Sequence, residues 1–463
     1  MLKSSLGSRS PRRLVSLLTV AVSMSVVAGL TVGAPVASSA SGEVVAAAPT
    51  ASQVRSAPET NAKRYMPKEG AHFNTPREGA RQYVIEREVL GAINHAIKGT
   101  AIRMSMFSFD RMVVADALVR AKRRGVSVKV LVNNHEMTAA QAKLRSVLGN
   151  NRNKKNWWFQ CKSACRGQGD VNHSKFILFR KAGGANYTTM VGSMNMKQNG
   201  TDNQFNDLFV ENGQKPLFTF YNRIFNEMAK DKNAKPMYVK KTFGDGKFWV
   251  HILPFPKAPL GTPKTRYTVA RDPMNQILRP IKCRNARTPS GRTAVRVNMH
   301  AWDGTRGTML ANRFRDLYAQ GCDVKILVGF AGEKVRRVFA NRTKRGYVPV
   351  RSTGFDTNGD RMIDKYSHEK TLMVNGNYGK KRGDKFIVTG SANHQDGGQY
   401  GDEIIMRVRG PRLHSQYVNN WNVKWNRYSH GFSWGAAGMP RASGPAILGW
   451  NGLGTDSPEW EDE

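Results

Sequence analysis

The sequence predicts an α/β protein of two fused sandwich lobes, each a mixed β-sheet flanked by helices, with pseudo-two-fold symmetry. Two observations indicate this class. A polar motif occurs twice, as His173-Ser174-Lys175 before Gly192-Ser193-Met194-Asn195, and as His368-Glu369-Lys370 before Gly390-Ser391-Ala392-Asn393. The strand-like and helix-like segments around the two copies also follow one another in the same order. Strand–helix–strand units with short connections favour a sheet covered by helices.

Each copy of the repeat contains, in order, a strand, an amphipathic helix and four further strands. Alternating apolar residues predict the strands, and apolar residues at three- and four-residue spacing predict the helices. The paired segments are 102–107 and 295–300, 112–124 and 309–320, 128–132 and 324–328, 176–179 and 371–374, 188–191 and 385–389, and 208–210 and 404–406. Each helix ends at a glycine, Gly125 or Gly321, as helices commonly do.

The N-terminal region has a composition unlike that of the repeats. Basic residues precede an apolar run from Leu14 to Val36, which ends in small residues near Ala40. This layout is typical of a secretory signal peptide; a twin-arginine signal and a membrane anchor are the alternatives. The following segment is rich in Ala, Pro, Ser and Thr, which favours disorder. The predicted organisation is a signal peptide at 1–40, a disordered leader or linker at 41–77, lobes at 78–255 and 256–435, and a C-terminal tail at 436–463.

Charge and cysteine content point to the environment in which the chain works. The formal net charge of +38 favours anionic partners such as phospholipid headgroups, nucleic acid or phosphate-rich wall polymers. A general arginine bias is the alternative explanation.

Four cysteines in an exported chain predict two disulfides, which we expect to be Cys161–Cys165 and Cys283–Cys322. Zinc binding is disfavoured because the His and Cys positions lack ligand spacing.

The doubled motif predicts a site for a phosphodiester. One histidine can attack phosphorus and the other can protonate the leaving oxygen, because imidazole titrates near neutral pH. Lys175 and Lys370 lie two residues along a strand from the histidines and face the same side, where they can offset phosphoryl charge. The other candidates are the amide donors Asn195 and Asn393, the hydroxyls Ser193 and Ser391, and Asp207 and Glu403 as acceptors for the second imidazole nitrogens. This chemistry needs no metal or other cofactor.

The doubled His-x-Lys and Gly-Ser-x-Asn motifs resemble those of the phospholipase D superfamily over most of residues 80–409. The resemblance implies two phospholipase D-like lobes and a phosphohistidine intermediate. The usual order in duplicated members makes His173 the nucleophile and His368 the acid. The family pattern places an aspartate five residues after each lysine, where this chain has Arg180 and Asn375.

Three functions follow as expectations. The leading one is a secreted, monomeric phosphodiesterase that hydrolyses or transphosphatidylates glycerophospholipids at a membrane surface. A secreted nuclease of the same superfamily is the second, because phosphate contacts dominate sequence-independent nucleic-acid binding. A catalytically decayed protein that binds anionic surfaces is the third, motivated by Arg180 and Asn375. The headgroup preference stays open.

One acidic segment resembles a calcium-binding loop. The spacing of its oxygen-bearing side chains matches the beginning of such a loop. These residues are Asp356, Asn358, Asp360 and Asp364. Arg361 stands where the loop's glycine is expected, and an acidic turn is the alternative.

Overall fold

The computed structural model describes residues 65–167, 171–255, 269, 271–360 and 363–432. The predicted signal peptide at 1–40 and the predicted tail at 436–463 lie outside these residues. Within the described ranges, no helix is long and apolar enough to cross a bilayer.

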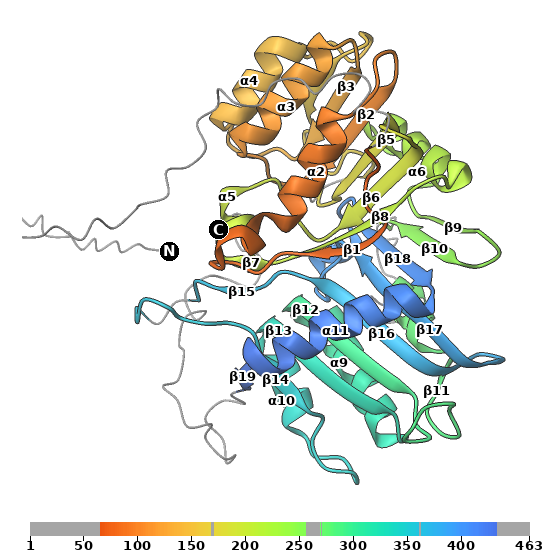
Figure 1. The fold of residues 1–463 in the computed structure, drawn as a ribbon. Helices are drawn as coiled ribbons and strands as arrows, with labels where there is room; N and C mark the ends of the chain where they lie inside the picture. The colour runs from red at the N-terminus through yellow and green to blue at the C-terminus, as the bar shows by residue number, and fades with distance from the viewer. Residues whose placement is uncertain (1–64, 168–170, 256–268, 270, 361–362, 433–463) are drawn as a thin grey trace, which may run out of the picture. The chain divides into compact units, whose positions relative to one another are not determined.

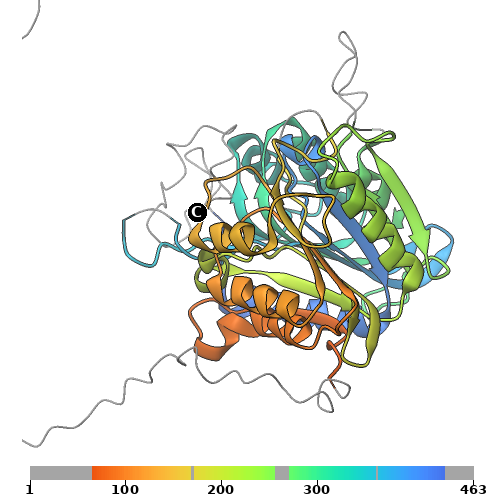
Figure 2. The same cartoon turned by 90° about the horizontal axis from the view of Figure 1, so that it is seen from above.

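The first lobe contains a seven-stranded mixed sheet in the order β1-β8-β6-β5-β2-β3-β4 (Figure 1). Its strands are β1 (Gly70–Phe73), β2 (Ala101–Met106), β3 (Ser127–Val132), β4 (Trp157–Gln160), β5 (Phe176–Ala182), β6 (Ala185–Gly192) and β8 (Asp207–Glu211). The helical segments are η1 (Gly79–Tyr83), α2 (Val84–Asn94), α3 (Met112–Arg123), α4 (Ala139–Leu148), α5 (Gln198–Asp202) and α6 (Lys215–Met228). Viewed from above, α2, α3 and α4 cover one face of the sheet and α6 covers the other (Figure 2).

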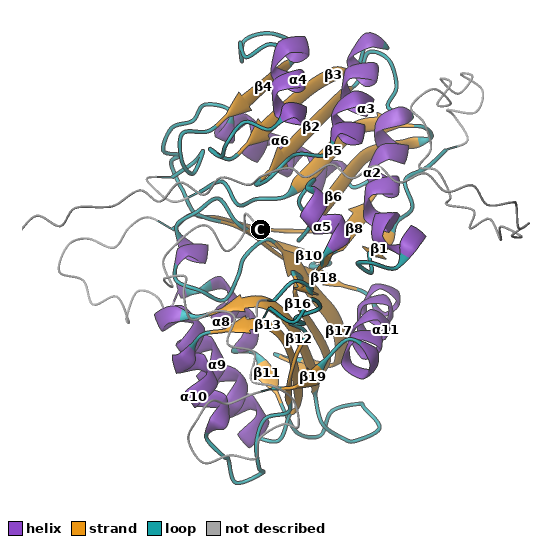
Figure 3. Cartoon of the chain, turned by 90° about the vertical axis from the view of Figure 1, so that its left-hand side faces the viewer, coloured by secondary structure: helices purple, strands orange, loops and turns teal. Residues whose placement is uncertain are grey.

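The second lobe contains a ten-stranded mixed sheet in the order β19-β14-β13-β12-β16-β17-β18-β10-β9, with β11 also paired to β16. Its strands are β9 (Val239–Phe243), β10 (Phe248–Ile252), β11 (Ile281–Lys282), β12 (Ala294–Trp302), β13 (Asp323–Ala331), β14 (Val350–Ser352), β16 (Lys370–Tyr378), β17 (Lys381–Gly390), β18 (Ile404–Arg409) and β19 (His430–Gly431). The helical segments are α8 (Pro273–Leu278), α9 (Gly304–Ala319), α10 (Glu333–Ala340), η2 (Gly397–Gln399) and α11 (Pro411–Arg427). The helices α8, α9 and α10 lie on one side of this sheet and α11 on the other (Figure 3).

The two sheets repeat one strand order, which confirms the predicted fold class. The order β8-β6-β5-β2-β3-β4 in the first sheet corresponds to β18-β17-β16-β12-β13-β14 in the second. The helices α3 and α9 follow equivalent strands and end before Gly125 and Gly321, whose φ angles of +90° and +107° favour glycine. The pseudo-two-fold relation between the lobes stays a prediction.

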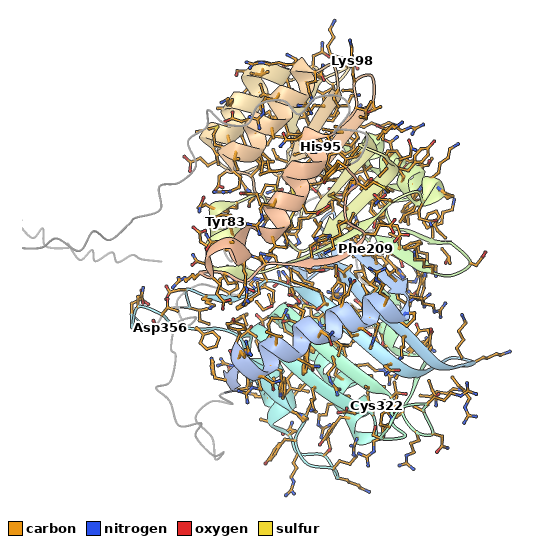
Figure 4. The ribbon with its side chains drawn as sticks, in the orientation of Figure 1. Tyr83, His95, Lys98, Phe209, Cys322 and Asp356 are labelled. Atoms are coloured by element: carbon orange, nitrogen blue, oxygen red, sulfur yellow. A yellow bond between two sulfur atoms is a disulfide. The ribbon has the colours of Figure 1, made fainter. Side chains whose placement is uncertain are left out.

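Side chains from both sheets share one apolar cluster between the lobes. It combines Phe176 and Phe209 of the first sheet with Met373 and Met406 of the second. The helices α6 and α11 also contribute to it. Phe209 lies at the level where the two sheets face each other (Figure 4). The lobes therefore bury part of their apolar surface against each other.

Two details differ from the sequence-based boundaries. The predicted disordered leader at 41–77 contains β1, which pairs antiparallel with β8 and forms an edge of the first sheet. The hairpin β9–β10, which the boundary at 255 assigns to the first lobe, pairs instead with β18 of the second sheet. Pro254 comes directly after the hairpin, because β10 ends at Ile252. A proline at this place does not determine which sheet edge the preceding hairpin joins.

Candidate active site

A short parallel pairing places His368 beside the first lobe. The strand β15 (Tyr366–Ser367) pairs with β7 (Gln204–Phe205), and the backbone N–H of His368 donates to the carbonyl oxygen of Phe205 at 2.9 Å. His368 is therefore held by backbone contacts that come from the other lobe.

A matching contact places His173 beside the second lobe. Asn172 forms an isolated parallel bridge with Asp402, whose backbone N–H donates to the carbonyl oxygen of Val171 at 2.9 Å. Each histidine motif is thus preceded by a segment that is bonded to the opposite lobe.

These two backbone pairings between the lobes place each imidazole beside a polar side chain of the other lobe. His173 Nδ1 lies 2.7 Å from Oε1 of Glu403, and His368 Nδ1 lies 2.8 Å from Oδ1 of Asn206. Both histidines are buried, with exposures of 2% and 0%. The predicted contact with Glu403 is present, whereas the partner of His368 is an amide.

The predicted partner Asp207 lies elsewhere, which corrects the sequence-based assignment. Its carboxylate accepts from the Thr389 hydroxyl at 2.5 Å and from the Tyr417 hydroxyl at 2.8 Å. Burial, followed by the charge of Glu369, raises the pKa of Asp207. The sequence comparison matched residues by acidity, but strand register makes Asn206 the equivalent of Glu403. Each of the two directly precedes the first residue of its strand, β8 or β18.

The two loop serines bind the partners of the histidines. The Ser193 hydroxyl donates to Asn206 Oδ1 at 3.1 Å, and the Ser391 hydroxyl donates to Oε2 of Glu403. From the motif spacing we expect both hydroxyls near the phosphoryl oxygens. In the structure the two hydroxyls instead hold Asn206 and Glu403, which in turn orient the imidazoles.

The glycine before each serine permits this arrangement. A Cβ atom at Gly192 would lie 2.1 Å from the carbonyl oxygen of Asp207, and one at Gly390 would lie 2.1 Å from that of Ile404. No side chain fits at such distances. The loops therefore run directly against the start of β8 and of β18.

Both motif lysines are buried beside the histidines. Lys175 Nζ donates to the carbonyl oxygen of His173 at 2.9 Å and lies 4.9 Å from the ring centroid of Phe107. Lys370 Nζ lies 2.7 Å from Nε2 of His368. Two ammonium groups at this position can neutralise the oxygens of a bound phosphoryl group.

The motif asparagines are oriented by backbone amides. Asn195 Oδ1 accepts from the N–H of Ser108, and Asn393 Oδ1 accepts from the N–H of Ala301, both at 3.3 Å. Since each side-chain oxygen accepts, the –NH2 groups are the ends that can donate to an anion.

A third imidazole, which the sequence reasoning did not single out, contacts His368. The His300 ring centroid lies 4.7 Å from that of His368. At the corresponding place in the first lobe, Phe107 lies 5.0 Å from His173. The repeat alignment of 102–107 with 295–300 contained this signal, because it aligns Phe107 closely with His300.

The two positions that depart from the family pattern lie along the strands from the site. Arg180 is five residues beyond Lys175 on β5, which corresponds to about 16 Å of strand. Its guanidinium lies over the ring of Tyr187, 4.0 Å from the centroid. Asn375, at the equivalent position on β16, is opposite Ala294 in the sheet.

In the predicted calcium loop, the carboxylates accept hydrogen bonds from backbone N–H groups of the same loop. Asp356 Oδ1 accepts from the N–H groups of Asn358 and Gly359, and Asp364 Oδ2 accepts from the N–H of Thr357. Among the residues that the structure describes, no group of three or more His, Cys, Asp or Glu residues is arranged to hold a metal. Arg361 lies outside those residues, and Asp356 lies in an exposed loop (Figure 4). Calcium binding stays a prediction.

Both disulfides have the expected pairing. Cys161 is bonded to Cys165, and Cys283 to Cys322. The first disulfide lies next to the site, because the backbone N–H of Cys165 donates to a carboxylate oxygen of Asp402. Burial raises the pKa of Asp402 to about 7.

Comparisons with known proteins agree with this architecture. The family model described as "Cardiolipin synthase, PLD-like domain" matches residues 89–229, which lie in the first lobe. A search of curated proteins found no match.

The matches among solved structures include the following three. Phosphatidylserine synthase from Haemophilus influenzae is 12% identical over 81% of this chain and 91% of its own, with a TM-score of 0.51. Polyphosphate kinase from Porphyromonas gingivalis is 13% identical over 77% of this chain, with a TM-score of 0.48, and this chain spans only 50% of its length. The phospholipase D family member Nuc from Salmonella typhimurium is 21% identical over 35% of this chain and 96% of its own, with a TM-score of 0.27.

Proposed function

Because this chain belongs to the phospholipase D superfamily, we propose that it is a secreted phosphodiesterase that cleaves the headgroup from glycerophospholipids. The observation that carries the proposal is that the two histidine motifs are each held by the opposite lobe. Each histidine is bonded through Nδ1 to a side chain of the opposite lobe. The Nε2 atoms are therefore the ones that can take part in the chemistry. Both rings are buried, and His173 acts electrostatically on His368.

The reaction needs two steps. One imidazole attacks phosphorus through Nε2 and forms an N–P bond, while the bond to the headgroup oxygen breaks. The other imidazole, initially protonated, gives that oxygen its proton. In the second step the now neutral imidazole takes a proton from water or an alcohol. The oxygen of that acceptor forms the new P–O bond as the N–P bond breaks.

The remaining motif residues stabilise charge on the phosphoryl oxygens. Lys175 and Lys370 supply ammonium groups, and the –NH2 groups of Asn195 and Asn393 supply hydrogen bonds. Donors that are already oriented before the reaction lower the barrier most effectively, because they need no reorganisation in the transition state.

The departures at Arg180 and Asn375 are compatible with activity. Both side chains lie about 16 Å along their strands from the motif lysines, a distance that excludes direct contact with the reacting phosphate. This distance argues against the interpretation of a decayed protein that only binds anionic surfaces.

Secretion is part of the proposal. The signal-like segment at 1–40 and the two disulfides support it, because disulfides persist in oxidising compartments. Detection of the mature protein in the culture medium, with its N-terminus near Ala40, tests this part.

The lipid proposal is tested with purified protein and vesicles of phosphatidylcholine or phosphatidylglycerol in the presence of a chelator. We expect headgroup release, and a loss of at least about 100-fold in His173→Ala and in His368→Ala. The matched control is His95→Ala, because the His95 ring, at the end of α2, stacks on Tyr65 outside the site (Figure 4). No headgroup release from either vesicle would contradict the proposal.

A nuclease is the second candidate, favoured by the net charge of +38. Plasmid DNA is therefore included in the same assay. Cleavage of DNA without lipid turnover, lost in both histidine variants, would replace the lipid proposal with this one. Equal inactivity of wild type and variants on all substrates would favour the binding protein.

A further inference from the structure

The second lobe has a strongly basic surface outside the candidate active site. Two segments form it: residues 377–385, which include the turn between β16 and β17, and residues 279–292, which link α8 to β12. Together they contain nine Lys and Arg residues, all of them exposed, and a single acidic residue, Asp384. We call these nine side chains the basic patch. The hairpin and β11 lie side by side at the lower right of Figure 1.

Backbone contacts hold the two segments together. Lys282 is opposite Asn377 where β11 pairs with β16, and the N–H of Gly379 donates to the carbonyl oxygen of Pro280 at 2.8 Å. The disulfide of Cys283 attaches the linking segment to the apolar core of the second lobe. The patch is therefore built on a fixed backbone, so little backbone order has to be imposed when a ligand binds.

Little acidic charge offsets the basic patch. The Asp384 carboxylate accepts from Nε of Arg409 at 2.9 Å, and its side chain is only 8% exposed. Asp323, at the start of the neighbouring β13, is paired with Arg296 at 2.5 Å. Among the residues that the structure describes, none of the nine patch side chains forms an ion pair. Such a concentration of uncompensated charge attracts polyanions over long distances.

The patch offers no exposed ring on which a base could stack. Tyr378 is the only aromatic residue in the two segments, and it is 6% exposed. The guanidinium of Arg407 lies over its ring, 5.5 Å from the centroid. Stacking on aromatic rings contributes much of the affinity for single-stranded nucleic acid. The patch is therefore suited to a ligand that is recognised through its phosphates alone.

The length of β16 separates the patch from the catalytic motif. Lys370 begins this strand and Tyr378 ends it, which corresponds to about 26 Å of strand. A bilayer bound end-on at the patch would lie too far from Lys370 to deliver a lipid to it. The patch is therefore suited to a ligand other than the substrate surface.

The position of the charges favours a flexible ligand. They lie both on a protruding hairpin turn and on the segment beside it. A straight duplex touches a protruding turn along one line, whereas a flexible chain can bend round the turn and reach both segments. Each phosphate that a Lys or Arg neutralises releases counterions, which strengthens binding at low salt.

We propose that the basic patch binds a flexible cell-wall polymer of polyol units linked by phosphodiesters, and that it thereby retains part of the protein at the cell surface. This inference goes beyond the proposed lipid activity. It rests on the secretion that is part of the proposed function.

Binding of fluorescently labelled poly(glycerol phosphate) to the purified mature protein, measured by anisotropy, tests the proposal. We expect Lys380→Glu/Lys381→Glu/Arg382→Glu to weaken binding at least about 10-fold at low salt and to make the salt dependence of Kd shallower. Turnover of a soluble short-chain phosphatidylcholine should be unchanged in this variant, because the three residues lie outside the site. An independent variant on the linking segment, Arg284→Glu/Arg287→Glu, should also weaken binding.

The matched control changes the net charge by the same amount on the first lobe. Arg123→Glu/Lys154→Glu/Lys155→Glu reverses three exposed basic side chains there. We expect this control to weaken binding by less than about 3-fold, because long-range attraction alone is lost. Equal weakening in the control and in the hairpin variant would overturn the inference, since binding would then follow the total charge. Thermal unfolding of each variant shows whether it is folded.

Two other polyanions serve as alternatives in the same measurement. If the wild-type protein uses the hairpin to bind phosphatidylglycerol vesicles or duplex DNA but does not bind poly(glycerol phosphate), the inference is overturned. In cultures of the producing cells, a larger share of the hairpin variant than of the wild type should appear in the medium instead of the wall fraction.

The outcomes also separate this inference from the proposed function. Binding that depends on the patch, in a wild-type protein that releases no headgroup, would support the inference and contradict the lipid activity. An uncleaved wild-type protein that stays inside the cell would contradict secretion, and with it the encounter with a wall polymer.

Discussion

At the scale of single residues, the site depends on groups that do not touch the phosphate. Asn206 and Glu403 fix the tautomers of the two histidines, and Ser193 and Ser391 fix Asn206 and Glu403. Residue type predicted the histidines, because few side chains can attack phosphorus or protonate a leaving group near neutral pH. Residue type did not predict Asn206, because its role follows from strand register, and the neighbouring Asp207 is the more conspicuous candidate.

Asp402 gives the folded protein a measurable pH dependence. Burial raises its pKa to about 7 in the folded state, so the folded chain binds a proton that the unfolded chain releases between about pH 4 and 7. This group therefore stabilises the fold at low pH, and that contribution is lost as the pH rises to about 7. Asp402→Asn should remove this contribution to the pH dependence of the unfolding free energy.

Denaturant titrations of wild type and Asp402→Asn at pH 4.5, 5.5 and 6.5 (about the middle of this window) check the expectation. The difference in unfolding free energy between the two proteins should change by up to about 1.4 kcal/mol per pH unit. Parallel pH profiles would show that Asp402 is ionised throughout this range.

At the scale of elements, local patterns predicted what lies within each lobe. Alternation and helical spacing sufficed for β2, α3 and β3 and for β12, α9 and β13, because each buries one face against its own sheet. The hairpin β9–β10 was assigned to the wrong lobe because its pattern does not state which sheet edge it joins. The parallel pairing of β7 with β15 involves only two residues of each strand. Segments this short have no hydrophobic periodicity from which the pairing could be predicted.

The two disulfides offer a test at this scale. The loop closed by Cys161 and Cys165 donates backbone hydrogen bonds to Asp402, the neighbour of Glu403. We therefore expect Cys161→Ser/Cys165→Ser to lower kcat on phosphatidylcholine through displacement of Glu403. The stability cost should be small, about 2 kcal/mol, because the cysteines are only 4 positions apart in the sequence.

The second disulfide is the matched control. Cys283 and Cys322 are 39 residues apart and belong to the apolar core of the second lobe. Removing this bond should cost about 4 kcal/mol of unfolding free energy and leave kcat unchanged at a temperature where the protein is folded. Equal kcat values for both double variants would contradict a role of the Cys161–Cys165 loop in positioning the site.

At the scale of the whole molecule, one apolar cluster joins the two lobes. Phe209 of the first sheet lies in it, 6.5 Å from the ring of Phe248 in the second sheet. We expect Phe209→Ala to cost about 3–5 kcal/mol and to lower the stability of both lobes together. A single unfolding transition, coincident by far-ultraviolet and near-ultraviolet circular dichroism, is the expected result. Two separated transitions would mean that the lobes fold independently.

The active site is also a property of the whole molecule, since neither lobe contains both an imidazole and its partner. The sequence predicted two copies of the motif and hence one shared site. It did not predict that the copies differ in the group behind each ring. His173 has the carboxylate of Glu403 behind its ring, and His368 has the amide of Asn206.

The most direct test is to trap and locate the covalent intermediate. Wild-type protein is mixed with phosphatidyl-p-nitrophenol, quenched in alkaline detergent during the burst, digested and analysed by mass spectrometry. The account predicts a phosphatidyl group on a peptide that contains His173 or His368, absent in the corresponding alanine variant. Continued turnover without any modified histidine would contradict it.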